Sequence, residues 1–227
     1  MSVNKYNNRI KQKVKKGSRS VSSRRWLERQ LNDPYVKAAK DQGYRTRAAY
    51  KLIEIHEKFK IFKNKVKVLD LGSAPGGWSQ VASKMLSNNK NMKIVAVDIL
   101  EMKPIDGVHF IKGDILDDTI LDDIKNSFSN KVDLVLSDIA PSATGHKNTD
   151  QTRSVLLAEM ALDTAICFLI NGGNFCCKLI RGKGEEEIVK KMRIYFKKIK
   201  RYKPDSSRKD SSEIFLIGLN FTHQDLA

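Results

Sequence analysis

The sequence predicts an α/β fold in which helices cover both faces of a mostly parallel, seven-stranded sheet. The first observation is that short runs rich in Val, Ile and Leu alternate with segments of helical periodicity. The second is a glycine-rich loop, "DLGSAPGGWSQ", which stands between the first such run and the helical segment after it. Strands that alternate with helices form parallel sheets, because each helix carries the chain back to the start of the next strand.

Three regions follow along the chain, whose 227 residues suit one domain with an additional arm. Residues 1–25 are rich in Lys and Arg and poor in apolar side chains, so we expect a flexible basic arm. Residues 26–62 are expected to form N-terminal helices, because Ala48, Leu52, Ile55 and Phe59 recur at helical spacing. Residues 63–227 are expected to complete the same single domain as its core.

Short strands and helices share this core region. The expected strands are Val66–Leu71, Lys93–Asp98, Val108–Lys112, Val132–Ser137, Asn174–Ile180, Ile199–Tyr202 and Glu213–Asn220. The expected helices are Gly76–Leu86, Thr119–Phe128, Asp150–Leu169 and Glu185–Phe196. The last two strands follow each other closely, which indicates a hairpin and an antiparallel strand in the sheet.

The charge balance points to a polyanionic partner. The chain carries 42 Lys and Arg against 26 Asp and Glu, a formal net charge of +16. Nucleic acid is the simplest partner for such a surplus. A generally basic, Lys- and Asn-rich proteome is the alternative explanation.

Other features narrow the class of protein. The apolar runs are too short to cross a bilayer, and the basic N-terminus has no apolar core of a secretory signal. Cys167, Cys176 and Cys177 form no CxxC pair and lie in apolar segments, so we expect buried, reduced thiols in a cytoplasmic protein. The four histidines share no ligand-like spacing, so no metal site is expected.

The glycine loop predicts a site for a nucleoside. Glycines at this place let the chain turn tightly and let a ligand approach the bare backbone. The second strand ends in Asp98, an acid placed to accept hydrogen bonds from both hydroxyls of a ribose. The loop is not GxGxxG, it lacks the Lys-Ser/Thr of a P-loop, and Pro75 removes a backbone donor. These features favour a nucleoside without phosphates over a nucleotide.

The segment "VLDLGSAPGGWSQVA" resembles the S-adenosylmethionine loop of FtsJ-type ribose 2′-O-methyltransferases. The likeness extends through "YRTRAAYKLIEI", "VLSDIAPSATG", "FCCKLIRG" and "KPDSSRKDSSEIFLI", and leaves only about the first 20 residues outside it. The bacterial members that modify large-subunit ribosomal RNA are the most similar. The resemblance implies the Rossmann-like fold of class I methyltransferases, with S-adenosylmethionine as cofactor.

The resemblance also implies roles for particular residues. A Lys-Asp-Lys-Glu tetrad surrounds the reacting ribose in this family. It corresponds here to Lys51, Asp138, Lys178 and Glu213. The cofactor positions carried over are Gly76, Trp78, Asp98, Asp114 and Asp138. Trp78 would offer its indole or its backbone to the cofactor.

The chemistry of the reaction sets what the tetrad must do. A ribose hydroxyl is a poor nucleophile, so positioning and proton removal should dominate. We expect Lys178 to accept the hydroxyl proton or to orient its lone pair. Lys51 and Asp138 would assist directly, with Glu213 behind them. Each of the four taken alone could be an ordinary solvated charge.

The expected activity is methylation of a uridine ribose in 23S ribosomal RNA of the large subunit, by a monomer without metal. A transfer-RNA ribose methyltransferase and a non-catalytic RNA-binding ribosome-assembly factor remain open. The basic arm is expected to contact RNA phosphates together with a set of cationic residues. These are Arg24, Arg25, Arg45, Arg47, Lys147 and Arg181.

Overall fold

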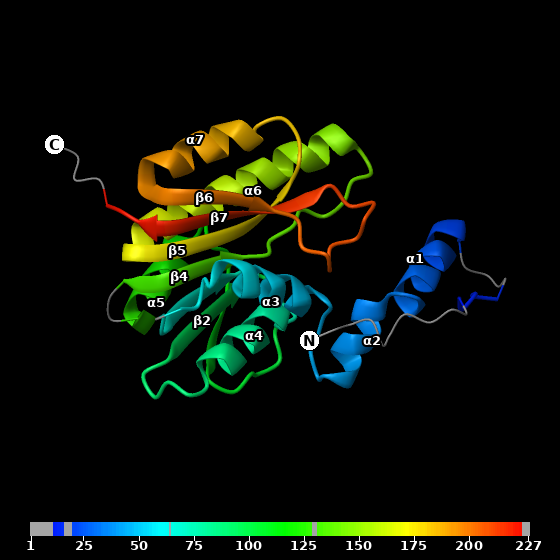
Figure 1. Ribbon diagram of the computed structural model, residues 1–227, viewed down its shortest axis with the longest axis horizontal. Helices are drawn as coiled ribbons and strands as arrows, with labels where there is room; N and C mark the ends of the chain where they lie inside the picture. The colour runs from blue at the N-terminus through cyan, green and yellow to red at the C-terminus, as the bar shows by residue number, and fades with distance from the viewer. Residues whose placement is uncertain (1–10, 16–19, 64, 129–130, 224–227) are drawn as a thin grey trace.

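The computed structural model describes residues 11–15, 20–63, 65–128 and 131–223. These residues form a seven-stranded sheet in the order β3-β2-β1-β4-β5-β7-β6 (Figure 1). Its strands are β1 (Lys67–Leu71), β2 (Lys93–Asp98), β3 (Val108–Lys112), β4 (Val132–Ser137), β5 (Leu169–Ile180), β6 (Phe196–Tyr202) and β7 (Glu213–Phe221). The predicted fold class is confirmed.

The direction of β7 shapes the site. The strands β1 to β5 pair in parallel, whereas β7 lies between β5 and β6 and is antiparallel to both. The expected hairpin of the last two strands is therefore present. Because β7 runs the opposite way, its first residue, Glu213, pairs with Ile180 at the end of β5. An acid from β7 thus reaches the edge where the parallel strands end, which is where ligands bind in such sheets.

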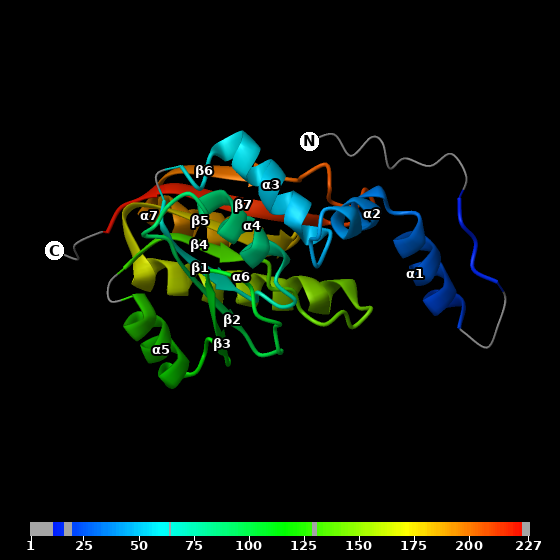
Figure 2. The same ribbon diagram turned by 90° about the horizontal axis from the view of Figure 1, so that it is seen from below.

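Helices cover both faces of the sheet (Figure 2). They are α1 (Val21–Leu31), α2 (Pro34–Asp41), α3 (Ala48–Phe59), α4 (Gly77–Leu86), α5 (Asp118–Phe128), α6 (Lys147–Phe168) and α7 (Glu185–Tyr195). One face packs under α3 and α4, with Leu52 and Val81 fully buried against it. The other packs under α5, α6 and α7, with Leu162 and Met192 fully buried. Both faces are apolar, as a central parallel sheet requires.

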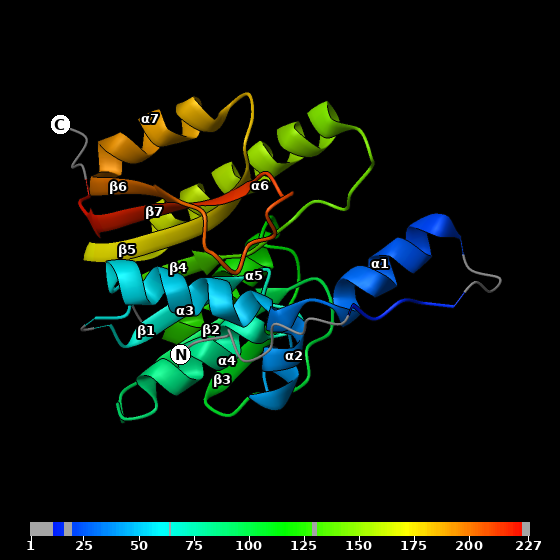
Figure 3. The same ribbon diagram turned by 45° about the vertical axis from the view of Figure 1, so that its right-hand side comes forward.

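The first two helices lie beyond the edge at which the parallel strands end (Figure 3). The helix α1 begins at Val21, five residues before the predicted start at Trp26. The Ser20 side chain caps it by accepting a hydrogen bond from the backbone N–H of Ser23. Residues 21–25 are therefore helical and not part of a flexible arm. Residues 1–10 and 16–19 of the predicted arm lie outside the described residues.

Two of the three cysteines occupy the core, as predicted. Cys176 and Cys177 are fully buried neighbours on β5, and burial raises the pKa of the Cys177 thiol to about 12. The prediction was wrong for Cys167, which is an exposed free thiol near the end of α6. The apolar run around it belongs to a helix packed on one side only, so the residues on its outer side, Cys167 among them, face solvent. None of the described helices is long and apolar enough to cross a membrane.

Candidate active site

The glycine loop folds over the end of β2. The backbone N–H groups of Gly72 and Ser73 both donate to the Val97 carbonyl, at 2.9 and 3.2 Å. Gly72 has φ +68°, and a Cβ there would overlap the Ile139 side chain and lie 3.1 Å from the Ile139 Cα. Only glycine fits, because it tolerates positive φ and brings no Cβ.

Gly76 serves the construction of the loop. It precedes α4 at φ +110°, and a Cβ there would meet Ile105 and the Arg45 guanidinium. That guanidinium donates to the carbonyls of Pro75, Lys103 and Pro104 at 2.9, 2.7 and 2.7 Å. Arg45 therefore ties the loop to the segment after β2. These donors are not available to a phosphate, which differs from the predicted phosphate contact. Gly76 leaves the space that this contact needs.

A cavity of about 540 Å³ opens beside the loop. Asp98 and Asp114 line it, as the sequence predicts for cofactor contacts. Asp98 accepts hydrogen bonds from the N–H groups of Ala74 and Leu100, both at 2.8 Å, so its carboxylate is fixed in orientation. Asp114 accepts from Leu116 N–H at 3.0 Å, which fixes it in the same way.

The cavity walls fit an adenosine group. Ile99 and Leu116 line it, yet their side chains are 64% and 67% exposed. Large apolar side chains left this exposed at a cavity mouth are suited to cover the face of an aromatic ring. The apolar walls and the two fixed carboxylates together match a nucleoside, whose base is apolar on its faces and whose ribose donates hydrogen bonds.

The N-terminus of α4 provides a smaller adjoining pocket of about 200 Å³, lined in part by Gly77 and Trp78. No side chain caps this helix. Its first backbone N–H groups therefore face the pocket region without an intrahelical acceptor, an arrangement that binds carboxylates. Both cavities share Gly72, Ala74 and Asp138.

The Trp78 indole does not reach the cofactor cavity. The side chain is 2% exposed, its N–H donates to the Ala48 carbonyl at 2.9 Å, and its ring lies 5.6 Å from that of Phe215. The tryptophan after the glycines thus packs α4 against α3 and β7. Of the two contacts that the sequence left open, only the backbone of Trp78 remains for the cofactor.

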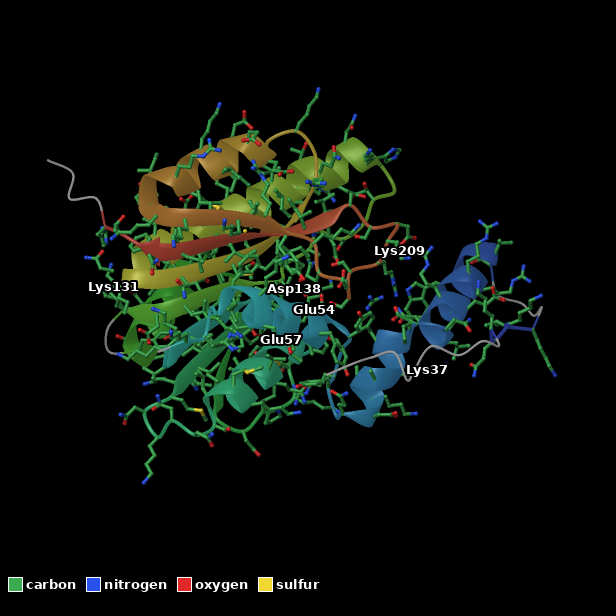
Figure 4. The ribbon with its side chains drawn as sticks, in the orientation of Figure 1. Lys37, Glu54, Glu57, Lys131, Asp138 and Lys209 are labelled. Atoms are coloured by element: carbon green, nitrogen blue, oxygen red, sulfur yellow. The ribbon has the colours of Figure 1, made fainter. Side chains whose placement is uncertain are left out.

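The four tetrad residues form two ion pairs at the carboxyl edge of the sheet (Figure 4 labels Asp138). Lys178 Nζ lies 2.9 Å from Asp138 Oδ1 and also donates to the Asp138 carbonyl at 2.6 Å. Lys51 Nζ lies 2.7 Å from Glu213 Oε1. All four side chains are less than a fifth exposed. They come from α3, β5, β7 and the end of β4, so only the folded chain assembles them.

The two pairs also interact with each other. Burial raises the pKa of Glu213, but the charge and hydrogen bond of Lys51, the hydroxyl of Ser207 and the charge of Lys178 together hold it below its ordinary value. Glu213 is therefore ionised at neutral pH. Lys178 is close enough to contribute to that field, so the tetrad is one electrostatic unit.

Asp70 is a buried acid behind the glycine loop that the sequence reasoning missed. It is 1% exposed on β1 and accepts a 2.6 Å hydrogen bond from the Ser79 hydroxyl of α4. Burial is the main reason that its pKa is raised to about 7; the Ser79 hydrogen bond opposes the rise, and the charges of Asp138 and Asp98 add to it. The available signal was an acid inside an apolar strand directly before the glycines. The three carboxyl groups are therefore close enough to interact electrostatically.

The remaining predicted phosphate contacts differ in availability. Arg25, Lys147 and Arg181 are exposed, and Arg24 is half-buried. Arg47 is paired with Asp33 and donates to the Ser206 carbonyl. Among the described residues no cluster of three His, Cys, Asp or Glu could hold a metal ion.

Residues 44–221 match the family described as FtsJ-like methyltransferase. The chain belongs to this family. It is 47% identical over 218 residues to "Ribosomal RNA large subunit methyltransferase E" of Rickettsia akari, and 48% identical to the protein of that name from Rickettsia bellii. In both cases the match covers 95% of this chain and 96% of the relative.

A solved structure shares the fold. It is a ribosomal RNA methyltransferase from Plasmodium falciparum, 32% identical, with a TM-score of 0.72 over 80% of this chain and 100% of the other. Members of the FtsJ-like family are S-adenosylmethionine-dependent methyltransferases, and this chain is such an enzyme. The cavity beside the glycine loop, with its apolar walls and two fixed carboxylates, accords with that cofactor.

Replacing Asp98 with asparagine is expected to weaken S-adenosylmethionine binding by about 10- to 100-fold, because hydrogen bonds to a charged acceptor contribute roughly 1.5–3 kcal/mol. An asparagine can accept from only one of the two backbone donors and places its own N–H groups against the other. Isothermal titration calorimetry measures the change. Asp123→Asn, on the exposed side of α5, is the matched control. Equal affinities of the two variants would exclude Asp98 from the cofactor site.

Proposed function

We propose that this protein transfers a methyl group from S-adenosylmethionine to the 2′-hydroxyl of a uridine ribose in the RNA of the large ribosomal subunit. The relatives that match over 95% of the chain carry the name of a large-subunit ribosomal RNA methyltransferase. The net charge of +16 suits an RNA substrate. A ribosomal substrate favours a cytoplasmic location, and monomeric, metal-free action remains our expectation.

The position of the tetrad carries the proposal. Asp138 lines the cofactor cavity and the small pocket at α4. Lys51 and Glu213 line a separate outer cleft of about 430 Å³, whose other walls include three arginines. The Asp138–Lys178 and Lys51–Glu213 pairs therefore stand between the cavity beside the glycine loop and a cationic cleft. A ribose held there would contact both amines.

The contacts of Lys178 with Asp138 fix its amine and leave it able to donate to the substrate. An ammonium group has three N–H donors. Lys178 donates one of them to the Asp138 carbonyl, and its Nζ lies 2.9 Å from the Asp138 carboxylate, whose Oδ1 accepts no hydrogen bond. A donor therefore remains for the ribose hydroxyl, whose oxygen it would hold and orient. When deprotonated, the same nitrogen would accept the hydroxyl proton as the new O–C bond forms. S-adenosylmethionine supplies an electrophilic methyl group when it is bound.

Lys51 and Glu213 complete the positioning. Lys51 is fixed by Glu213 and lies 5.7 Å from the centre of the Phe215 ring, so its amine has a defined place on the wall of the cleft. We propose that Lys51 contacts the ribose and that Glu213 acts through Lys51. A transfer-RNA substrate would use the same tetrad, but the named relatives favour ribosomal RNA. A non-catalytic scaffold is disfavoured by the intact, buried tetrad.

Expression of the chain in a bacterial strain that lacks its large-subunit uridine ribose methyltransferase is expected to restore one 2′-O-methyluridine in 23S RNA. The reason is that the tetrad can act only on a hydroxyl held in the cleft. Mass spectrometry of nuclease digests locates the methyl group, with an empty vector as control. A methyl group on a nucleobase, or on transfer RNA alone, would refute the proposal.

A further inference from the structure

The outer cleft holds more positive charge than the catalytic pairs require. Asp33 is 8% exposed and lies between two arginines, pairing with Arg47 and lying 3.6 Å from the Nε of Arg208. One carboxylate thus faces two guanidinium groups, which leaves one positive charge in surplus. The Nε of Arg208 is buried and makes no hydrogen bond. Arg47 and Arg208 both line the cleft that contains Lys51 and Glu213.

The opposite wall of the cleft is the helix α1. Arg29 and Gln30 of α1 line the same cleft. Arg29 also pairs with Asp210, from the loop between β6 and β7, at 3.5 Å. Figure 4 labels Lys209 on this loop, between the sheet and α1. Both partners of the Arg29–Asp210 pair are more than half exposed, so the pair is weak and a phosphate can displace the carboxylate.

The same face of α1 carries an exposed tryptophan. Trp26 precedes Arg29 by three residues and Gln30 by four, so the three side chains share one face of the helix. Its side chain is 56% exposed, which is uncommon for so large an apolar group. Arg25, also exposed, stands four residues before Arg29. Aromatic rings beside arginines are how proteins bind single-stranded RNA, because bases stack on the ring while phosphates pair with guanidinium groups.

We infer that α1 and the Arg208 wall form a track for the single-stranded RNA beside the acceptor nucleotide, in which Trp26 stacks on a flanking base and Arg29 and Arg208 hold the backbone phosphates. This inference rests on the proposed function, since it continues the cleft in which the acceptor ribose would lie. Stacking accepts any base, so the track fixes the position of the strand without reading its sequence. Double-stranded RNA would leave Trp26 without a base, because bases in a duplex are already stacked.

The two tryptophans of the chain give a direct test. Trp78 is buried, so a fluorescence change on adding a short single-stranded oligouridylate to the full-length protein without cofactor reports Trp26. We expect quenching in the wild type. Trp26→Ala should weaken binding of the fluorescein-labelled oligomer by about 5- to 150-fold, the range for one lost stacked base, and Trp26→Phe should restore part of it. Arg29→Ala should remove one phosphate contact, which lowers the slope of log affinity against log salt concentration by about one.

Kinetics with undermethylated large subunits separate this role from catalysis. Trp26→Ala and Arg29→Ala should raise KM for the subunit while kcat and S-adenosylmethionine affinity stay near the wild-type values. Arg193→Ala, which removes the same charge from exposed α7, is the control. Oligomer binding by Trp26→Ala equal to wild type overturns the track. A raised KM with unchanged oligomer binding also overturns it and points to a ribosomal protein as partner. Oligomer quenching without any methyl transfer by the wild type would refute the function and leave the track standing.

Discussion

Replacing Lys178 with alanine is expected to reduce methyl transfer by about 10²- to 10⁴-fold, the usual contribution of a group that handles the reacting proton. Lys178 makes one hydrogen bond and one ion pair with Asp138 and keeps a donor for the ribose hydroxyl. Its removal takes away the only proposed contact with the reacting oxygen. Cofactor affinity should change little, because Lys178 does not line the cofactor cavity. Single-turnover assays with radiolabelled methyl groups and calorimetry measure the two effects.

A lysine outside the site gives the control for this experiment. Lys200→Ala removes the same charge from the exposed edge strand β6 and should leave turnover unchanged. The Lys51→Ala, Lys178→Ala double variant should be scarcely slower than Lys178→Ala, because residues that act as a unit give non-additive losses. Turnover of Lys178→Ala within tenfold of the wild type would remove Lys178 from the proposed role, and a matching loss of cofactor binding would make that role structural.

The order of strands and helices could be predicted because it depends on local periodicity. Strand β1 and helix α4 differ from the prediction by one residue at their first ends, and the antiparallel β7 followed from the short connection before it. The start of α1 was missed because it depends on a cap, the Ser20 side chain, in a segment whose composition resembles a disordered tail. Composition alone does not separate the two, since charged residues suit both an exposed helix and a flexible arm.

The side-chain roles in the glycine loop could not be predicted from spacing. The partner of the Trp78 indole is the Ala48 carbonyl, 30 positions away, and nothing in the local sequence specifies that contact. Arg45 looked like a phosphate contact because it is a cation in a basic protein. Its acceptors are three carbonyls, one of them in the loop and two in the segment after β2. Only the tertiary fold brings these carbonyls within reach of one guanidinium group.

The tetrad residues, in contrast to the side chains of the loop, were identified from the sequence. These four residues are far apart in the sequence, and resemblance to a family rather than periodicity marked them. The structure brings them into two contacting pairs, which supports that expectation. Topology explains it physically: three of the four stand at the carboxyl ends of parallel strands or in the first turn of α3, and the reversed strand β7 brings the fourth to the same edge.

Replacing Gly72 with alanine is expected to lower the free energy of unfolding by about 2–4 kcal/mol, combining backbone strain at positive φ with overpacking. The added methyl group would overlap the Ile139 side chain and lie 3.1 Å from its Cα, so rotation of that side chain cannot relieve the contact. The backbone of Ile139 must move. Since Asp138 precedes it and anchors Lys178, turnover should fall together with stability.

Gly43→Ala separates the two causes. Gly43 has φ +72°, close to the +68° of Gly72, but nothing lies within 4 Å of an added Cβ there. It should therefore show the backbone strain alone, with normal turnover. Denaturant unfolding and steady-state kinetics measure the stability and the turnover of both variants. The difference between the variants gives the effect of the contact with Ile139. If Gly72→Ala were no less stable than Gly43→Ala and turned over normally, the loop would have room beside Ile139.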